Sequence, residues 1–232
     1  MITPRRSADR GHADHGWLDT YHTFSFAHYH DPDFMGFSDL RVLNQDRVAP
    51  GQGFGTHGHD NMEIVSYVLE GVLEHKDSMG TGSQVVPGDV QLMSAGTGVT
   101  HSEFNGSESD PLEFLQMWVI PAERGTEPRY EQRHFSEQER ANTLRLVASP
   151  DGADGSLTLG QDTRLYAGTL APGATMTHEV PPRRRLWLHV ARGSIELNDL
   201  TLGPGDGAAI QDESALRFEG REQAELVLFD LA

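Results

Sequence analysis

The sequence predicts an all-β protein made of two related antiparallel β-domains. Short apolar runs separated by Gly, Pro, Asn and Asp recur along most of the 232 residues, a pattern typical of β-sandwiches and β-barrels. Helical patterns are few. The turn signals of the first half also recur, in the same order, in the second half. A chain of this length is expected to form one or two domains at roughly 150 residues each.

The first half contains four clear strand candidates. Each is a short apolar run bounded by turn residues and rich in β-branched or aromatic side chains. These runs cover residues 40–43, 63–69, 90–93 and 113–120. Turn signals at 70–71, 87–89 and 105–106 separate them, and Pro121 closes this half of the chain.

The stretch 122–154 is more polar than its neighbours, and we expect it to connect the two domains. The N-terminal domain would then cover 1–121 and the C-terminal domain 155–232. Ser136 is followed three residues later by Glu139, which is the signature of a capping box. A short helix is therefore expected over 137–140.

The second half repeats the turns of the first. The matching pairs are Pro172-Gly173 with Pro50-Gly51, Arg192-Gly193 with Glu70-Gly71, Pro204-Gly205 with Pro87-Gly88, and Glu219-Gly220 with Asn105-Gly106. Four turn signals in one order indicate an internal duplication.

Two short motifs in the first half predict a metal site. His57-Gly58-His59 and His101-Ser102-Glu103 each place two ligand-type residues two positions apart. In a strand such residues project to the same face, so each pair offers two converging ligands. Imidazole and carboxylate groups suit a divalent first-row metal, and four protein ligands leave positions for water or substrate. We therefore expect one metal ion bound by His57, His59, His101 and Glu103.

The second copy is expected to lack this site. His178 matches His57, but Val180 or Pro181 stands where His59 would be. Residues without ligand atoms of the right kind, Ala215 and Arg217, fall near the positions of His101 and Glu103. The predicted chemistry is thus confined to the N-terminal half.

Composition excludes several functional classes. The 35 acidic against 18 basic side chains give a net charge of -17, which disfavours direct binding to nucleic acid or to anionic membranes. No cysteine is present, so a metal must use nitrogen and oxygen ligands, and the chain suits the reducing cytoplasm. No apolar h-region follows Met1, and no window approaches the roughly 18 apolar residues of a membrane helix.

The remaining histidines are expected to have structural roles. His28 and His30 lie among aromatic and acidic residues with nothing downstream to complete a second metal site, and His12 and His15 belong to a polar N-terminal arm. His75 follows a turn closely, which predicts a position at a sheet end and no ligand role.

Two further alternatives concern the surroundings of the predicted site. Glu63 shares strand parity with His57 and His59, so it could orient a ligand histidine if the strand continued through Asp60. The apolar side chains nearby are expected in the core rather than in a pocket; they are Phe24, Phe26, Phe54 and Met93.

A longer set of motifs covers nearly all of residues 1–120. They include His22-Thr23-Phe24-Ser25-Phe26-Ala27, Gly53-Phe54-Gly55-Thr56-His57, His75-Lys76-Asp77-Ser78-Met79-Gly80, Met93-Ser94-Ala95-Gly96-Thr97-Gly98 and His101-Ser102-Glu103. In these motifs the chain resembles the pirin family of the cupin superfamily, and especially bacterial pirin-like proteins with quercetin 2,3-dioxygenase activity.

The resemblance implies a fold, a cofactor and a reaction. The fold would be a bicupin, with two antiparallel β-barrels of the jelly-roll type. The metal ligands would be His57, His59, His101 and Glu103, with Fe(II) as the first expectation and Mn, Co, Ni, Cu or Zn as alternatives. The reaction would be oxidative cleavage of a flavonol such as quercetin by O₂ with release of carbon monoxide, and Glu103 would be the catalytic base that takes the proton of the 3-hydroxyl group.

Family membership alone leaves two functional classes open, since pirin relatives include dioxygenases and a nuclear transcriptional co-regulator. The alternative to a dioxygenase is therefore a metal-responsive binding protein that regulates a protein partner and has incidental quercetinase activity. An isomerase or sugar-binding cupin is a third interpretation. A dioxygenase requires a small flavonol-like substrate and O₂, and a metal-responsive regulator requires a protein partner that the sequence does not specify.

Overall fold

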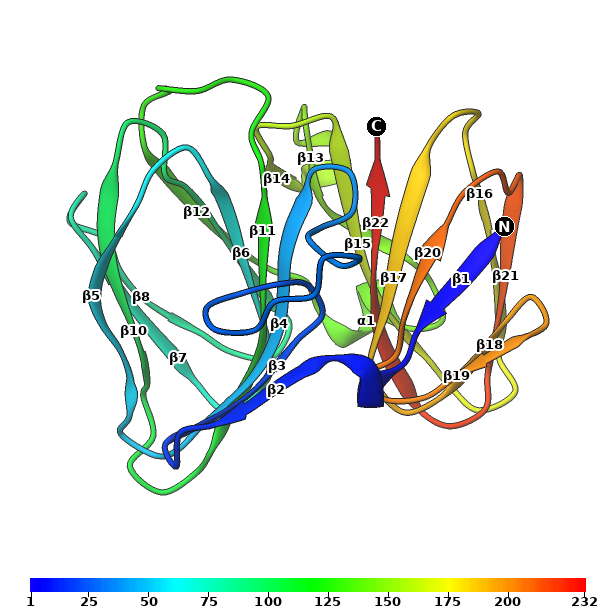
Figure 1. The fold of residues 1–232 in the computed structure, drawn as a ribbon, viewed down its shortest axis with the longest axis horizontal. Helices are drawn as coiled ribbons and strands as arrows, with labels where there is room; N and C mark the ends of the chain where they lie inside the picture. The colour runs from blue at the N-terminus through cyan, green and yellow to red at the C-terminus, as the bar shows by residue number, and fades with distance from the viewer. The chain divides into compact units, whose positions relative to one another are not determined.

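The computed structural model describes all 232 residues and is built almost entirely of β-strands (Figure 1). The chain forms two compact units, and each contains one larger and one smaller antiparallel sheet. The all-β prediction is confirmed. The only α-helix, α1 (Glu137–Arg140), has four residues, so no helix could cross a membrane.

The N-terminal unit comprises Gly11–His134 and Leu157–Gln161. Its larger sheet has seven strands in the order β12-β9-β6-β11-β4-β3-β2. The strands are β2 (Gly11–Asp14), β3 (Leu18–His22), β4 (Leu40–Val48), β6 (Glu63–Glu70), β9 (Asp89–Ser94), β11 (Leu112–Val119) and β12 (Arg129–His134). All four predicted strand runs are confirmed as β4, β6, β9 and β11.

The smaller sheet of this unit has the order β5-β10-β7-β8. Its strands are β5 (Gly53–His59), β7 (Leu73–Asp77), β8 (Gly82–Val85) and β10 (Val99–Asn105). The pairing of β10 with β5 shifts register between His101 and Glu103, which marks a β-bulge. Within this unit the two sheets lie opposite one another, as the left half of Figure 1 shows.

The space between these two sheets is filled in layers. One apolar cluster includes Val68 and Phe114, and a second includes Ile64 and Met93. On the strands that contribute to both clusters, the intervening inward positions are polar, as at Ser66 on β6. We call this buried set the polar layer; it consists of Thr20, Asp46, Ser66, His75, Gln91, His101, Glu103 and Gln116. Because burying such groups is costly without partners, their positions point to a functional interior.

The C-terminal unit comprises Met1–Arg10, Phe135–Ser156 and Asp162–Ala232. Six strands of its larger sheet follow the order β1-β20-β17-β22-β15-β13, and its smaller sheet runs β16-β21-β18-β19. The strands are β1 (Ile2–Arg5), β13 (Arg145–Ser149), β15 (Thr163–Leu170), β16 (Thr175–Glu179), β17 (Arg185–Arg192), β18 (Ile195–Leu197), β19 (Leu200–Leu202), β20 (Gly207–Ile210), β21 (Ala215–Gly220) and β22 (Ala224–Leu231). Two 3₁₀ turns, Ser7–Asp9 and Ala153–Gly155, also belong to this unit.

The predicted helix is confirmed with its capping box. Ser136 accepts a hydrogen bond from the backbone N–H of Glu139, and the Glu139 side chain accepts one from the backbone N–H of Ser136. These reciprocal bonds satisfy donors that a helix N-terminus leaves unpaired, which explains why so short a helix forms at this position.

The compact units differ from the domain boundaries expected at 121 and 154. The first ten residues belong to the C-terminal unit, where β1 pairs with β20. The segment 122–154, expected as a connection, contains β12 of one unit and β13 of the other, and β14 (Leu157–Thr158) returns to the N-terminal unit. Much of β12 is only partly buried, which explains why its sequence is polar.

The register of the second copy corrects the expected equivalences. In β5 and β10 His57 pairs with His101, and in β16 and β21 His178 pairs with Leu216. Leu216 and, two residues on, Phe218 therefore occupy the positions of His101 and Glu103, rather than Ala215 and Arg217. Both are fully buried in the apolar core of the C-terminal unit.

Candidate metal centre

Three histidine side chains converge inside the N-terminal unit. His57 and His59 lie on β5, and His101 lies opposite His57 on β10. The Nε2 atom of His101 lies 3.0 Å from Nε2 of His59 and 3.1 Å from Nε2 of His57. These three histidines therefore lie together in the structure, and their role as metal ligands stays a prediction.

Burial favours the neutral form of two of these histidines, His101 and His59. It lowers the pKa of His101 to about 3, and the neighbouring His57 and His59 add to the effect. Burial, followed by the charge of His57, lowers the pKa of His59 to about 4. Each shift has the direction expected when a cation is moved out of water and beside another cation. At neutral pH both imidazoles have a lone pair for a metal ion.

The ring of His57 is oriented by the backbone. Its Nδ1 lies 2.8 Å from the carbonyl oxygen of Gly55, which makes Nδ1 the protonated nitrogen. Nε2 is then an acceptor and points toward the other two histidines. Such a bond from the second ring nitrogen is typical of histidines that bind metals.

Glu103 lies beside this cluster, on the same strand as His101 and past the bulge. It is 1% exposed, and its two carboxylate oxygens accept hydrogen bonds from Ser66 Oγ at 3.1 Å and Gln116 Nε2 at 2.6 Å. Burial raises the pKa of Glu103 to about 7. A carboxylate oxygen of Glu103 and one ring nitrogen each of His101 and His75 lie within 4.8 Å of one another. The other set of potential ligand atoms within this distance comes from His57, His59 and His101.

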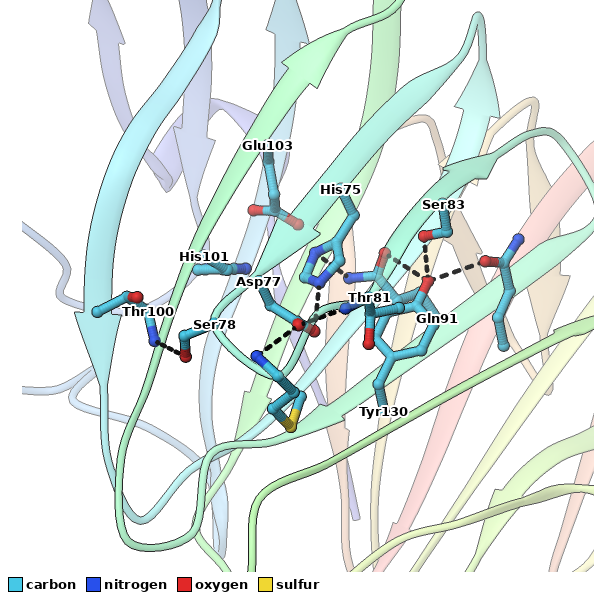
Figure 2. A network of polar contacts seen from close by, with 12 residues as sticks. His75, Asp77, Ser78, Thr81, Ser83, Gln91, Thr100, His101, Glu103 and Tyr130 are labelled. Atoms are coloured by element: carbon cyan, nitrogen blue, oxygen red, sulfur yellow. Dashed lines mark hydrogen bonds and ion pairs between the residues drawn. The ribbon is translucent and has the colours of Figure 1, made fainter.

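His75 is the residue of this region that sequence reasoning misjudged. It lies on β7 opposite Glu103 and is completely buried, so the expected position at a sheet end is wrong. Figure 2 shows its ring between Asp77 and Gln91: Nε2 lies 3.1 Å from the Asp77 carboxylate, and the Gln91 amide lies 3.4 Å from Nδ1. Both ring nitrogens therefore have partners, which favours a supporting role over metal binding.

The aromatic ring of Tyr130 closes this network from the other side. It stacks on His75 with 4.9 Å between ring centroids, and its hydroxyl group contacts Ser83 and Gln132. The His75 ring in turn packs 5.3 Å from that of His101 (Figure 2). The histidine cluster thus rests on a buried layer of hydrogen-bonded side chains.

A cavity of about 300 Å³ opens onto the cluster. His57, His59 and Glu103 line one side, and residues of β3, β4 and β11 line the other. Phe26 lines it, so its expected placement away from a pocket is wrong. Phe54 lines the cavity and also packs against an apolar core cluster, whereas Phe24 and Met93 are buried as expected. Its further lining residues are His15, Leu18, Thr20, His22, Ala27, Asn44, Asp46, Gln116 and Trp118.

The structure also decides the alternatives left by the sequence. Glu63 accepts hydrogen bonds from Ser94 and from the backbone N–H of Gly160, so it orients no ligand histidine. His28 and His30 are exposed, and their expected structural or pocket-rim role stays a prediction. His15, expected in a polar arm, instead contributes to the cavity wall.

Comparison with known proteins gives family matches in both halves of the chain. The model of the family described as Pirin matches residues 4–119, and that of the quercetinase C-terminal cupin domain matches residues 146–231. A quercetin 2,3-dioxygenase from Escherichia coli (strain K12) is 49% identical over 231 residues, covering 100% of this chain and 99% of the relative. The chain belongs to the pirin family.

Solved structures of pirins agree with this assignment. YhhW from Escherichia coli, 49% identical, superposes with a TM-score of 0.96 over 100% of this chain and 98% of its own. Bacterial pirin YhhW in complex with nickel(II) superposes with a TM-score of 0.94 over 100% and 99%. The expected bicupin fold is confirmed, although the sheets remain separate and do not close into barrels. In this pirin, both clusters of potential metal ligands lie in the N-terminal unit.

Proposed function

We propose that this pirin is a metal-dependent dioxygenase that cleaves the heterocycle of a flavonol such as quercetin with O₂ and releases carbon monoxide. The observation that carries the proposal is the convergence of three histidines beside a cavity that also contains Glu103: the Nε2 atoms of His59 and His57 lie 3.0 and 3.1 Å from Nε2 of His101. The relatives named quercetin 2,3-dioxygenase support the same reaction.

The donor set fits a divalent transition metal. Two nitrogen ligands at right angles, each about 2.1 Å from an ion, lie about 3.0 Å apart, which matches the observed separations. Hydrogen bonds could join these three nitrogens only through a single proton of His101 Nε2 shared between the other two, whereas a metal ion would accept the lone pairs of all three. We assign His57, His59, His101 and Glu103 as the ligands.

Several metals suit these ligands. Imidazole and carboxylate bind iron, nickel, copper, zinc and manganese alike, and a related pirin has been solved with nickel(II). We propose Fe(II) as the resident ion of this chain. When bound, the ion supplies the redox chemistry and the Lewis acidity that a flavonolate and O₂ need to react.

Glu103 supplies the proton acceptor. Its carboxylate is the one group among the proposed ligands that can also take up a proton as a general base, and burial raises the pKa of this group above its ordinary value. Ser66 and Gln116 hold its carboxylate on the cavity side, so it can take the proton of the flavonol 3-hydroxyl group. The resulting flavonolate is electron-rich, and the aromatic walls formed by Phe26, Phe54 and Trp118 hold it while excluding water.

Incubation with quercetin in air and without oxygen tests this function. We expect loss of flavonol absorbance and release of carbon monoxide in air only, with metal-loaded protein and not after chelation. The metal should be identified by elemental analysis of protein purified without chelators. Turnover at the same rate after complete metal removal would contradict the proposal.

The same protein preparations test the regulatory alternative. The absence of cysteine is consistent with a metal-binding protein of the cytoplasm. If metal-loaded protein released no carbon monoxide but retained a protein partner that metal-free protein did not, a metal-responsive regulator would replace the dioxygenase.

A further inference from the structure

The polar layer contains one buried pair that takes no part in supporting the histidine cluster. Ser66 and Gln116 bind Glu103, and Gln91 binds His75. Thr20 and Asp46, by contrast, bind one another: the Thr20 hydroxyl group donates to Asp46 Oδ1. This pair lies on β3 and β4, in the sheet opposite the one that holds the histidines.

Sheet register explains how this pair reaches the cavity. Thr20 pairs directly with Asp46, and His22 with Asn44 on the next inward positions. Asn44 pairs in turn with Gln116 on β11. All five side chains line the same cavity, so three neighbouring strands present a continuous polar wall toward the histidine cluster.

Asp46 is the unusual member of this wall. It is 3% exposed, and the hydrogen bond from Thr20 is the one that its side chain receives. A carboxylate can accept up to about four hydrogen bonds, so Asp46 has acceptor capacity to spare. Burial raises its pKa to about 7. A buried carboxyl group with so few partners is costly to stability, and a bound ligand that donates a hydrogen bond would remove part of that cost.

The other walls define the chemistry of such a ligand. Phe26 packs edge-on against Trp118, which packs edge-on against His59, with ring centroids 5.4 and 4.9 Å apart. Aromatic walls favour a flat aromatic molecule. A molecule held between the histidine cluster and the opposite wall must therefore be planar, with one oxygen function at the cluster and a second at Asp46.

We propose that Asp46, oriented by Thr20, is a specificity-determining residue that accepts a hydrogen bond from a substrate hydroxyl group remote from the reacting 3-hydroxyl. The inference rests on the proposed function and deepens it. It restricts the substrates to polyhydroxylated planar aromatics, because a flavonol without the remote hydroxyl leaves Asp46 without its ligand partner.

A selectivity measurement tests the role of Asp46. The substrates are quercetin and a panel of flavonols that lack the hydroxyl groups of one ring or the other, all retaining the 3-hydroxyl. We expect the wild-type protein to favour quercetin over at least one analogue by on the order of tenfold in kcat/KM. In metal-loaded Asp46→Leu protein that ratio should fall toward one. In Asp46→Asn, whose amide oxygen is still an acceptor but carries no charge, and in Thr20→Val it should fall partway.

The matched control is Arg47→Gln, on the next residue of β4, which is exposed. Its selectivity and metal content should equal those of the wild-type protein. A purely structural role for Asp46 would lower turnover of every flavonol by the same factor and leave the ratio unchanged. Unchanged selectivity in Asp46→Leu protein of full metal content would overturn the inference.

Failure of the proposed function would be visible separately. If the metal-loaded wild-type protein turned over no flavonol, the dioxygenase assignment would be wrong, and calorimetric titration with catechol would then decide the role of Asp46. Binding that is weakened in Asp46→Leu but not in Arg47→Gln supports the inference, and equal binding by the wild-type protein and both variants rejects it.

Discussion

A histidine in this protein acquires its role from what its second ring nitrogen contacts. The Nδ1–H group of His57 donates a hydrogen bond to the backbone carbonyl of Gly55, which leaves the lone pair of Nε2 available to a metal ion. His75 has partners at both nitrogens and becomes a support. His178, in the register position of His57, faces Leu216 rather than another ligand. The same side chain therefore has three different environments, set by its neighbours in the sheets.

Removing His101 should abolish metal binding. Its Nε2 is the atom nearest to both other histidines, so His101→Ala leaves only one strand to supply nitrogen ligands. We expect metal content to fall by at least tenfold, the lower end of losses seen even for indirect metal-site mutations. Elemental analysis measures this, with the exposed His28→Ala as control. Near-stoichiometric metal in His101→Ala would contradict the assigned ligands.

Replacing Glu103 by Gln should separate binding from turnover. The amide retains an oxygen that Ser66 can reach, but it cannot act as a base at neutral pH. We expect part of the metal to be retained while turnover falls by about 10²- to 10⁴-fold, the usual contribution of a general base. Metal content and steady-state rates are measured on the same samples. Full activity in this variant would exclude Glu103 as the proton acceptor.

Asp46 should make stability depend on pH. Burial raises its pKa from 3.8 to about 7, so the folded protein binds the proton more tightly than the unfolded chain. The stabilising contribution of the protonated form is complete below about pH 4 and is lost as pH rises through 7. Asp46→Asn, which cannot ionise, should therefore gain stability relative to wild type between pH 5 and pH 8, by on the order of 1–4 kcal/mol.

Urea unfolding of the wild-type and Asp46→Asn proteins at pH 5 and at pH 8 measures how the difference in their stability changes with pH. A relative stability that is independent of pH would mean that Asp46 is ionised throughout in the folded protein.

At the scale of single strands, the interior of the N-terminal unit follows a repeated pattern. β6 presents Ile64, Ser66 and Val68 inward, and β11 presents Phe114, Gln116 and Trp118. Each strand thus contributes a polar side chain between two apolar ones. The outer apolar layers stabilise the strands, which allows the central layer to consist of polar side chains, among them the proposed ligands and the residues that contact them.

Close contact between β5 and β10 depends on Gly53. A Cβ atom at this position would lie 2.3 Å from the carbonyl oxygen of Glu103 and 2.5 Å from Cα of Phe104, both backbone atoms. Gly53→Ala should therefore force the strands apart beside the bulge and cost about 1–3 kcal/mol. Weaker metal binding should accompany the loss of stability.

Gly55→Ala is the matched control on the same strand, because a Cβ atom there has no other atom within 4 Å. Unfolding curves and metal titrations of the two variants measure the difference. Equal behaviour of both variants would show that the strand separation is not critical.

At the scale of the whole molecule, each compact unit is assembled from separated segments of the chain. β1 extends the larger sheet of the C-terminal unit through four residue pairs with β20. Arg6 then forms an ion pair with Asp206 at 2.7 Å, and Asp206 also accepts a hydrogen bond from the backbone N–H of Ser7. The first ten residues therefore stabilise a unit whose other segments begin beyond residue 134.

Deleting residues 1–10 should destabilise the C-terminal unit without removing a metal ligand. The deletion removes the β1 ladder and the packing of Ile2 on the apolar core. We expect a loss of roughly 2–4 kcal/mol, and calorimetry should show a melting temperature lower by several degrees. Arg6→Gln, which removes only the ion pair, should have a smaller effect. An unchanged melting temperature would contradict this role for β1.

Part of this organisation follows from local sequence. Strand parity is a local property, so His57-x-His59 and His101-x-Glu103 predict converging ligands before any strand is paired. The capping box at Ser136 is equally local. Glu63 shows where strand parity stops being informative. β5 ends at His59 and Asn61 has a φ of 48°, so the chain turns there, and the parity of His57 and His59 does not extend to Glu63.

The sequence by itself determined the all-β class, the duplication and the four proposed ligands, because alternation, turn residues and short spacings express the backbone geometry directly. Only the tertiary structure decided that Asp46, Gln116 and His75 share the interior with the four proposed ligands. These residues come from three other strands, and which inward positions meet depends on strand order and register. Pairing between distant segments is a property of the whole fold, which no local pattern contains.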